Sequence, residues 1–231
     1  MATSGRRQAA THRSEQRIEE LLAVAKDVFA SHGFERATTQ EIAQRAGVSE
    51  ATVFAYFGSK RELCVEVIRR WYGHITAEIQ SQLPTGGGLR DQLQFIVRKH
   101  LDNLMGEGVG ICALVLTEGR TADKAFTEII AELKRSYTAP LMTALRTAHE
   151  AGVIRNDMPL RLMRDMVYGS MEHVLWDYVV SGSKPDIAVT STQLTDMLFS
   201  AFAPRRPSEN ALMDLHADLS MALKRFEAKS H

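Results

Sequence analysis

Side chains that could contact a nucleic-acid duplex gather between residues 39 and 55. The hydroxyls of Thr39 and Thr52 could donate hydrogen bonds to phosphate oxygens, and Thr39 would do so from a helix N-terminus, where the helix dipole favours an anion. The amide of Gln40 could reach a base edge, while Ala51 and Ala55 could touch thymine methyl groups. The alternative for each of these residues is an ordinary solvated helix face.

Two short helices must position these residues. Residues 38–41, Thr-Thr-Gln-Glu, are typical of a capping box, and the helix that they open ends at Gly47. Ser49 caps a second helix that runs to about Tyr56, before Gly58. A short turn that contains glycine therefore separates two short helices, which predicts a helix-turn-helix.

A longer helix precedes this motif and another follows it. Apolar residues recur with helical spacing before Gly33, at Ile18, Leu21, Leu22, Ala25, Val28 and Phe29. Residues 59–62, Ser-Lys-Arg-Glu, form a second capping box that opens a helix to about Gln82. The basic segment 1–13, with Arg6, Arg7 and Arg13, is expected to be a flexible arm or simply a disordered terminus.

The remainder of the chain predicts further helices at about 89–106, 109–119, 122–151, 159–182 and 187–203, and a last one at about 208–229 of unassigned role. The fold class is therefore all-α. The chain is 45% hydrophobic and 24% charged, as expected of a soluble globular protein. It contains no apolar segment near the roughly 18 residues that cross a bilayer, and no secretion signal, so we expect a cytoplasmic protein without membrane contact.

Signatures of enzymes and metal sites are missing from the sequence. It has no Gly-x-Ser-x-Gly, His-Glu-x-x-His or Cys-x-x-Cys motif, and no two of its eight histidines lie three or four residues apart. Cys64 and Cys112 are expected to be buried thiols. We therefore predict a protein that is not an enzyme and needs no cofactor or metal.

Residues 33–63 resemble the DNA-binding domain of the TetR (tetracycline-repressor-like) family of transcriptional regulators. The matching residues are Gly33-Phe34, Thr38-Thr39, Ile42-Ala43, Ala46-Gly47-Val48-Ser49, Thr52, Tyr56-Phe57, Ser59-Lys60 and Leu63. The resemblance implies a three-helix DNA-binding domain over residues 14–60, followed by a ligand-binding and dimerisation domain over 61–231.

The resemblance also implies roles for individual residues. Tyr56 and Lys60 match the phosphate-binding positions of the family. Phe54 replaces a tyrosine that is common there, so a thymine contact is favoured over a phosphate bond. Glu50 faces the groove, where it could accept from cytosine or repel incorrect sites.

The second domain is rich in methionine and aromatic residues, which line adaptable binding surfaces but also fill ordinary cores. Residues 116–120 and 169–176 resemble those of the acyl-coenzyme A sensing regulators of fatty-acid degradation within the family. Arg120 could pair with a phosphate or carboxylate of such an effector, or with a glutamate of the chain. The candidate ligand-binding residues are Met105, Cys112, Leu116, Arg120, Phe126, Met142, Met166, Met171, His173 and Trp176.

The segments 159–182 and 187–203 are expected to form a homodimer interface, because the apolar band of the first is too wide for one core-facing stripe. These observations predict a repressor that binds a palindromic operator in double-stranded DNA and leaves it when acyl-coenzyme A or a fatty acid binds. The alternative is a helical module that binds small molecules or proteins without recognising an operator.

Overall fold

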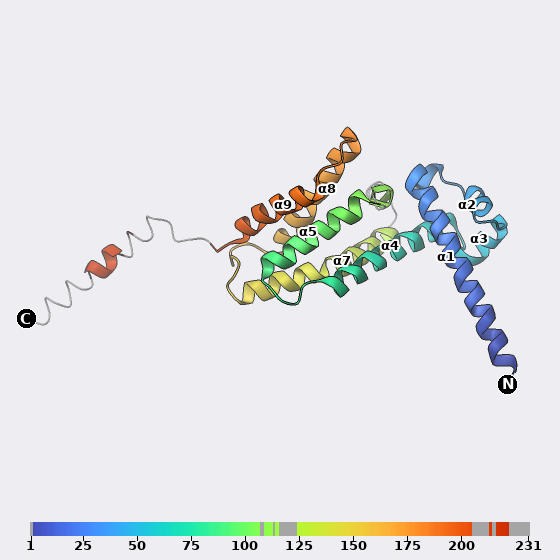
Figure 1. Cartoon of the computed structure of the whole chain (residues 1–231), viewed down its shortest axis with the longest axis horizontal. Coiled ribbons are helices and arrows are strands. Elements are labelled where there is room, and N and C mark those ends of the chain that lie inside the picture. Colours follow the sequence, from blue (N-terminus) through green and yellow to red (C-terminus); the bar gives the residue numbers. More distant parts are fainter. Residues whose placement is uncertain are drawn as a thin grey trace, which may run out of the picture.

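Every element in the described part of the chain is a helix, which confirms the all-α prediction. The computed structural model describes residues 14–106, 109–112, 114–115, 124–204, 213 and 216–221, and the backbone alone of residues 2–13 and 125. The helices are α1 (Ala2–Arg36), α2 (Thr39–Arg45), α3 (Glu50–Phe57), α4 (Lys60–Gln82), α5 (Leu89–Met105), α7 (Lys124–Glu150), α8 (Leu160–Ser181) and α9 (Ile187–Phe202). Figure 1 shows α1–α3 at one end of the molecule and α5–α9 beyond them.

The small N-terminal domain forms because each short helix begins at a side-chain cap. The Thr38 and Ser49 hydroxyl oxygens accept from the backbone N–H groups of Glu41 and Thr52, at 3.1 and 3.2 Å. Gly47, with φ of 66°, makes the turn between α2 and α3. The predicted helix-turn-helix is therefore confirmed, and so is the Thr38 cap of the predicted capping box, although the Glu41 carboxylate lies near His32 and Arg45, at 3.3 and 3.7 Å.

The long helix α4 joins the two parts of the molecule. The Ser59 hydroxyl caps its first turn, accepting from the backbone N–H of Glu62 at 3.1 Å. Its buried residues begin with Leu63 beneath the N-terminal domain and continue to Ile79 in the second domain. The helix packs on α1 and on α7, so it is part of both cores.

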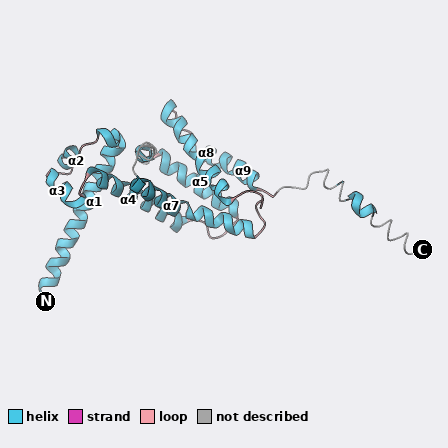
Figure 2. Ribbon diagram, turned by 180° about the vertical axis from the view of Figure 1, so that it is seen from behind, coloured by secondary structure: helices cyan, strands magenta, loops and turns pink. Residues whose placement is uncertain are grey.

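The second domain is a bundle in which α5 is central. Helix α5 contacts α4, α7, α8 and α9, and its strongest contact is with α9 (Figure 2). The Gln94 amide donates to the Ser191 hydroxyl at 3.2 Å across this contact. Helix α8 packs on α5, α7 and α9 with one side and leaves large apolar side chains exposed on its outer side.

Three segments differ from the expectation or lie beyond it. The backbone of residues 2–13 is helical and continuous with α1, whereas we predicted a flexible arm; no proline interrupts that segment. Of the helix predicted at 109–119, residues 109–112 and 114–115 are helical and the rest lie outside the described residues. Of the predicted last helix, 213 and 216–221 are helical, and its other residues lie outside the described part.

We predict that Gly47→Ala destabilises the protein while Gly73→Ala does not. Gly47 has φ of 66°, and a side chain in this left-handed conformation costs about 1–2 kcal/mol. Gly73 lies inside α4, and a Cβ added there would have open space around it, so alanine should stabilise by about 0.5–1 kcal/mol. Urea unfolding followed by circular dichroism measures both, and equal effects of the two substitutions would contradict the assignment of the turn.

Candidate functional site

The outward face of α3 is built from small and aromatic residues. Val53 and Phe57 are buried beneath it. On the opposite side Ala51 and Ala55 are exposed, together with Phe54 and Tyr56, whose exposed fractions are 44% and 38%. This face can therefore enter a groove, and it offers an exposed phenol hydroxyl.

Three polar residues that we predicted to meet DNA already have partners within the domain. Thr39 is only 8% exposed, and its hydroxyl donates to the Glu50 carboxylate, which ties α2 to α3. The Thr52 hydroxyl shares a hydrogen bond with that of Ser49 at 2.8 Å. Gln40, in contrast, is exposed at the start of α2 with its side chain unengaged by the residues described.

Lys60 has a different role from the phosphate contact that we predicted. Its Nζ donates to the carbonyl oxygens of Phe34 at 2.8 Å, Ala37 at 3.0 Å and Glu35 at 3.4 Å. It also lies 4.4 Å from the centroid of the Phe34 ring. Because an ammonium group has three donors, this set of carbonyls uses all of them. Lys60 therefore caps the carbonyl groups at the C-terminal end of α1 and ties them to the start of α4.

Two exposed cations of this domain were missing from the prediction. Arg36 ends α1 and Arg45 ends α2. Arg45 lies 3.7 Å from Glu41 in an exposed ion pair, which is weak and leaves the guanidinium able to turn toward another anion.

A small inner cavity lies at the centre of the second domain. Its volume is about 40 Å³, enough for water but far below the roughly 300–1,000 Å³ of ligand pockets. It is lined by residues of α4, α5, α7 and α8 together with residues 112 and 115. The lining residues are Trp71, Tyr72, Ile75, His100, Leu104, Cys112, Val115, Lys134, Tyr137, Glu172 and Leu175.

The structure places most of the predicted ligand-binding residues elsewhere. Cys112 lines the inner cavity, whereas Met105 and Met171 are buried in the surrounding core. Met142 and Met166 are half-buried against that core.

Two of the predicted ligand-binding residues lie on the outer side of α8, away from the inner cavity. Trp176 is 46% exposed, and the His173 imidazole lies on the same outer side, 3.9 Å from Asp177. Neither lines the inner cavity. Leu116 and Arg120 lie outside the described residues.

Aromatic rings pack around a histidine beside the inner cavity. The His100 ring centroid lies 5.4 Å from that of Tyr137 and 5.1 Å from that of Tyr168. The His100 Nδ1 and the Tyr137 hydroxyl form a hydrogen bond. Burial lowers the pKa of His100 to about 3 and raises the pKa of Cys112 to about 12, so the imidazole and the thiol are both neutral at physiological pH.

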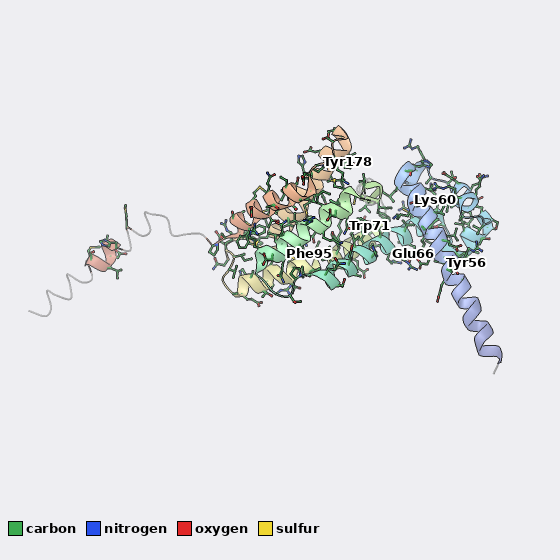
Figure 3. All side chains as sticks on the ribbon, viewed as in Figure 1. Tyr56, Lys60, Glu66, Trp71, Phe95 and Tyr178 are labelled. Atoms are coloured by element: carbon green, nitrogen blue, oxygen red, sulfur yellow. The ribbon has the colours of Figure 1, made fainter. Side chains whose placement is uncertain are left out.

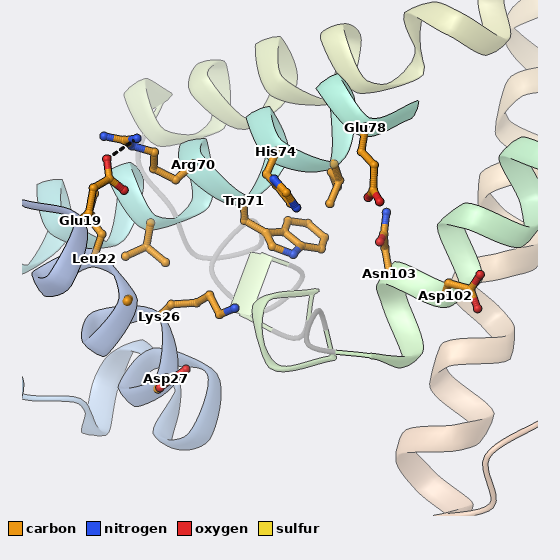
Figure 4. Close-up of a pocket in the computed structure, with 13 residues that line it drawn as sticks. Glu19, Leu22, Lys26, Asp27, Arg70, Trp71, His74, Glu78, Asp102 and Asn103 are labelled. Atoms are coloured by element: carbon orange, nitrogen blue, oxygen red, sulfur yellow. Dashed lines mark ion pairs between the residues drawn. The ribbon is translucent and has the colours of Figure 1, made fainter. Parts of the chain in front are cut away.

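A wider outer cleft of about 600 Å³ opens between α1, α4 and the end of α5 (Figure 4). Trp71 and Ile75 line both this cleft and the inner cavity, so they form the wall between the two. The cleft holds four carboxylates, from Glu19, Asp27, Glu78 and Asp102, beside Lys26, Arg70 and His74. Arg70 is already paired with Glu19 at 2.6 Å.

A groove of about 660 Å³ lies where the two domains meet. It contains Phe126, which we predicted to bind ligand, together with Tyr56 and Phe57 from the end of α3. Arg61 crosses this junction, with its guanidinium carbon 5.3 Å from the ring centroids of both Phe34 and Phe126. Phe126 is therefore a contact between domains rather than part of the inner cavity. Figure 3 shows Lys60, Glu66 and Trp71 following one another along α4 between the two sites.

Comparison with known protein families identifies the family of this chain. A model described as bacterial regulatory proteins of the tetR family matches residues 21–67. A second, described as the C-terminal region of YsiA-like proteins, matches residues 69–201, more than half of the chain. This chain belongs to the TetR family. Members of this family are transcriptional regulators with a DNA-binding helix-turn-helix and a ligand-binding C-terminal domain, and they are not enzymes.

Individual TetR-family relatives cover most of the chain. The fatty acid metabolism regulator protein of Bacillus subtilis is 22% identical over 78% of this chain and 93% of its own length. The crystal structure of FadR from Bacillus subtilis in complex with stearoyl-CoA matches with a TM-score of 0.72 and 21% identity, over 79% of this chain and 97% of that one. A Saccharomonospora viridis regulator in complex with choline matches with a TM-score of 0.71 and 20% identity, over 83% and 100%. At such low identity these two structures show only that the chain has the TetR fold. They do not indicate its ligand, because their own ligands, stearoyl-CoA and choline, are chemically unrelated.

The described helices include none long and apolar enough to cross a membrane. Among the same residues, no group of three or more histidine, cysteine, aspartate or glutamate side chains could hold a metal ion.

We expect Tyr56→Phe to weaken binding to every duplex by a similar factor. The substitution keeps the ring but removes the hydroxyl at the end of α3, which we call the reading helix because it enters the DNA groove in this family; helices α1–α3 form the reading domain. The loss of one hydrogen bond to a phosphate should cost about 1 kcal/mol, or roughly fivefold in affinity. Fluorescence anisotropy with a random-sequence duplex measures this, with Tyr178→Phe on α8 as the matched control. An unchanged affinity would show that the hydroxyl does not contact DNA.

Lys60→Met should lower stability rather than the number of phosphate contacts. The variant leaves the carbonyls at the end of α1 without their donor, so the free energy of unfolding should fall by about 1–3 kcal/mol. The exposed Lys184→Met is the control and should change nothing. The slope of log K against log salt should stay unchanged in folded Lys60→Met, whereas loss of a phosphate-binding lysine would reduce it by about 0.9.

Proposed function

We propose that this protein is a homodimeric repressor that binds a palindromic operator and releases it when a small, largely apolar effector, an acyl-coenzyme A or a fatty acid, enters the second domain. The observation that carries the proposal is the course of α4. This helix is anchored to the N-terminal domain by Leu63 and by the Lys60 ammonium, and three turns later its residues line the inner cavity. A ligand that moves those residues therefore acts on the helix that holds the DNA-reading domain.

The DNA contacts of this proposal differ from those expected at first, because several of the predicted residues have partners within the domain. Tyr56 contacts phosphate, while Gln40, Ala51, Phe54 and Ala55 face the bases. Thr39 and Glu50 bind each other, and so they support the orientation of α3 instead of reading bases directly. The Thr52 hydroxyl is hydrogen-bonded to that of Ser49, and it can donate to DNA when Ser49 is the donor of that bond.

The exposed face of α8 and α9 supports a dimer. Large apolar side chains are exposed there to an extent that is unusual for a monomer. They are Leu162, Trp176, Val179 and Val180 on α8, and Val189 and Met197 on α9. Gly169 lies among them, and a Cβ added to it would meet nothing within 4 Å, which leaves room for a partner helix. A two-fold dimer would place two reading helices on half-sites about 34–36 Å apart.

The apolar effector is supported by the lining of the inner cavity and by the relatives. Apolar and aromatic side chains make up most of the lining, and the two charged ones, Lys134 and Glu172, are of opposite sign. A Bacillus subtilis relative is named a fatty acid metabolism regulator, and a fold neighbour from that organism was crystallised with stearoyl-CoA. The cavity is too small for an acyl chain as it stands, so binding must displace the side chains around it.

Selection of duplexes from a random library tests the DNA-binding half of the proposal. The protein should enrich one palindromic sequence and bind it far more tightly than random duplex, with affinity falling as salt rises. A helical module without operator recognition would enrich nothing, and that result would favour the alternative function.

Gly169→Leu should break the dimer. The leucine would project from the exposed face of α8 into the space that we assign to the partner helix. The control is Gly73→Leu, which places the same side chain at an exposed glycine of α4. Analytical ultracentrifugation should show monomers or aggregates for Gly169→Leu alone. An intact dimer with unchanged operator affinity would place the interface elsewhere.

Acyl-coenzyme A thioesters and fatty acids of increasing chain length should bind with graded strength. We expect about 0.8 kcal/mol per buried methylene until the site is full. Because ligand binding and DNA release are linked, the same series should release operator DNA in the same order. Titration of the protein–DNA complex measures both. A flat response, with release caused instead by a cation such as choline, would overturn the effector class and leave the DNA-binding assignment standing.

A further inference from the structure

One polar atom beside the inner cavity has no partner. His100 is 7% exposed, and its Nε2 finds no hydrogen-bond partner among the residues described. An unpaired polar atom in a protein interior destabilises the fold, so one that persists calls for an explanation such as a ligand or a water molecule. His100 lines the cavity at the point where α5 faces α7.

The hydrogen bond on the other ring nitrogen determines what Nε2 can offer. The Tyr137 hydroxyl contacts His100 Nδ1, and the residues described give this hydroxyl no other acceptor. We assign the phenol proton to Nδ1, because the opposite tautomer would leave it without an acceptor among the described residues. The buried imidazole is neutral and carries one proton, which must then be on Nε2. Nε2–H is thus a hydrogen-bond donor that lacks an acceptor among the described residues.

The charges in the cavity lining favour an uncharged ligand group as the acceptor of the Nε2–H hydrogen bond. Glu172, which is half-buried, and Lys134, which is exposed, both line the cavity, so the lining carries no net charge, and His100 adds none. A carboxylate bound at Nε2 would have to lose its hydration without a net positive charge in the lining to compensate it. An uncharged oxygen, such as the carbonyl of a thioester or ester, needs only the donor that Nε2–H supplies.

We propose that His100 is the residue that recognises the effector's polar group, through a hydrogen bond from Nε2 to an uncharged carbonyl oxygen. The inference rests on the proposed function, because it assumes that the effector enters this domain. Entry is through the outer cleft, since Trp71 and Ile75 form the shared wall between the cleft and the inner cavity (Figure 4). Tyr137 is a positioning residue that keeps the ring proton on Nε2.

Two coenzyme A derivatives of equal chain length test the hydrogen bond. Palmitoyl-CoA has the thioester carbonyl, and S-hexadecyl-CoA is the thioether without it. The wild-type protein should bind the thioester about tenfold more tightly, the effect of one buried hydrogen bond, and should release operator DNA at correspondingly lower concentration. Isothermal titration and the DNA-release assay measure the two quantities independently.

Substitutions of His100 test whether this residue causes the preference for the thioester over the thioether. His100→Leu should reduce the affinity for the thioester to that for the thioether, while His100→Gln, which keeps an N–H donor, should restore part of the difference. The double substitution His100→Leu with Tyr137→Phe removes both hydrogen-bonding partners, so it should fold at least as stably and still lack the preference. His149→Leu, at the far end of α7, is the control and should keep the wild-type preference.

The outcomes separate this inference from the proposed function. If the wild-type protein binds both compounds equally and both release DNA, the role of His100 is wrong and the proposed effector class stands. The same holds if His100→Leu keeps the preference, which would mean that Nε2 is satisfied by a structural water only. If neither compound binds or releases DNA, the proposed acyl effector is wrong, and the inference falls with it.

Discussion

The structure depends on a single continuous helix, α4, that belongs to two hydrophobic cores. Its first turn, which the Ser59 hydroxyl caps, is held to the reading domain by Leu63 beneath it and by the Lys60 ammonium on the carbonyl oxygens at the end of α1. Further along, Arg70 pairs with Glu19 of α1, and Tyr72 packs edge-on against Tyr137 of α7. A helix so anchored cannot move in one domain without disturbing contacts in the other.

This arrangement explains how an event in a cavity could change affinity for DNA. Coupling between two sites requires an element with different contacts in two states, and it amounts to about 1–3 kcal/mol in most regulators. Arg61 adds a second connection, since its guanidinium lies between Phe34 of the reading domain and Phe126 of α7. The continuous helix α4 and the Arg61 contact both join the two domains at the first turns of α4. A small rotation of these turns would therefore change the separation of the two reading helices in a dimer.

The N-terminal domain was predictable because its determinants are local. Capping boxes, the glycine of the turn and the apolar spacing all lie within a few residues of the structure that they specify, and Thr38, Ser49 and Gly47 behave as expected. The partners of Thr39 and Lys60 were not predictable, because they come from residues 11 to 26 positions away. The inner cavity was harder still, since Tyr72, His100 and Tyr137 come from three helices. His100 looked like one of several scattered histidines, and the methionines that suggested a pocket turned out to be core or surface.

The small volume of the inner cavity suits a sensor better than a preformed pocket would. A ligand shifts the equilibrium between two states of a protein only as far as its affinity differs between them. Here a ligand must move Trp71 or its neighbours, and these residues belong to the helix that carries the reading domain. The side chains that fill the cavity in the free protein are thus the ones whose displacement could change the affinity for operator DNA. The same residues therefore account for the tight packing and for the response to a ligand.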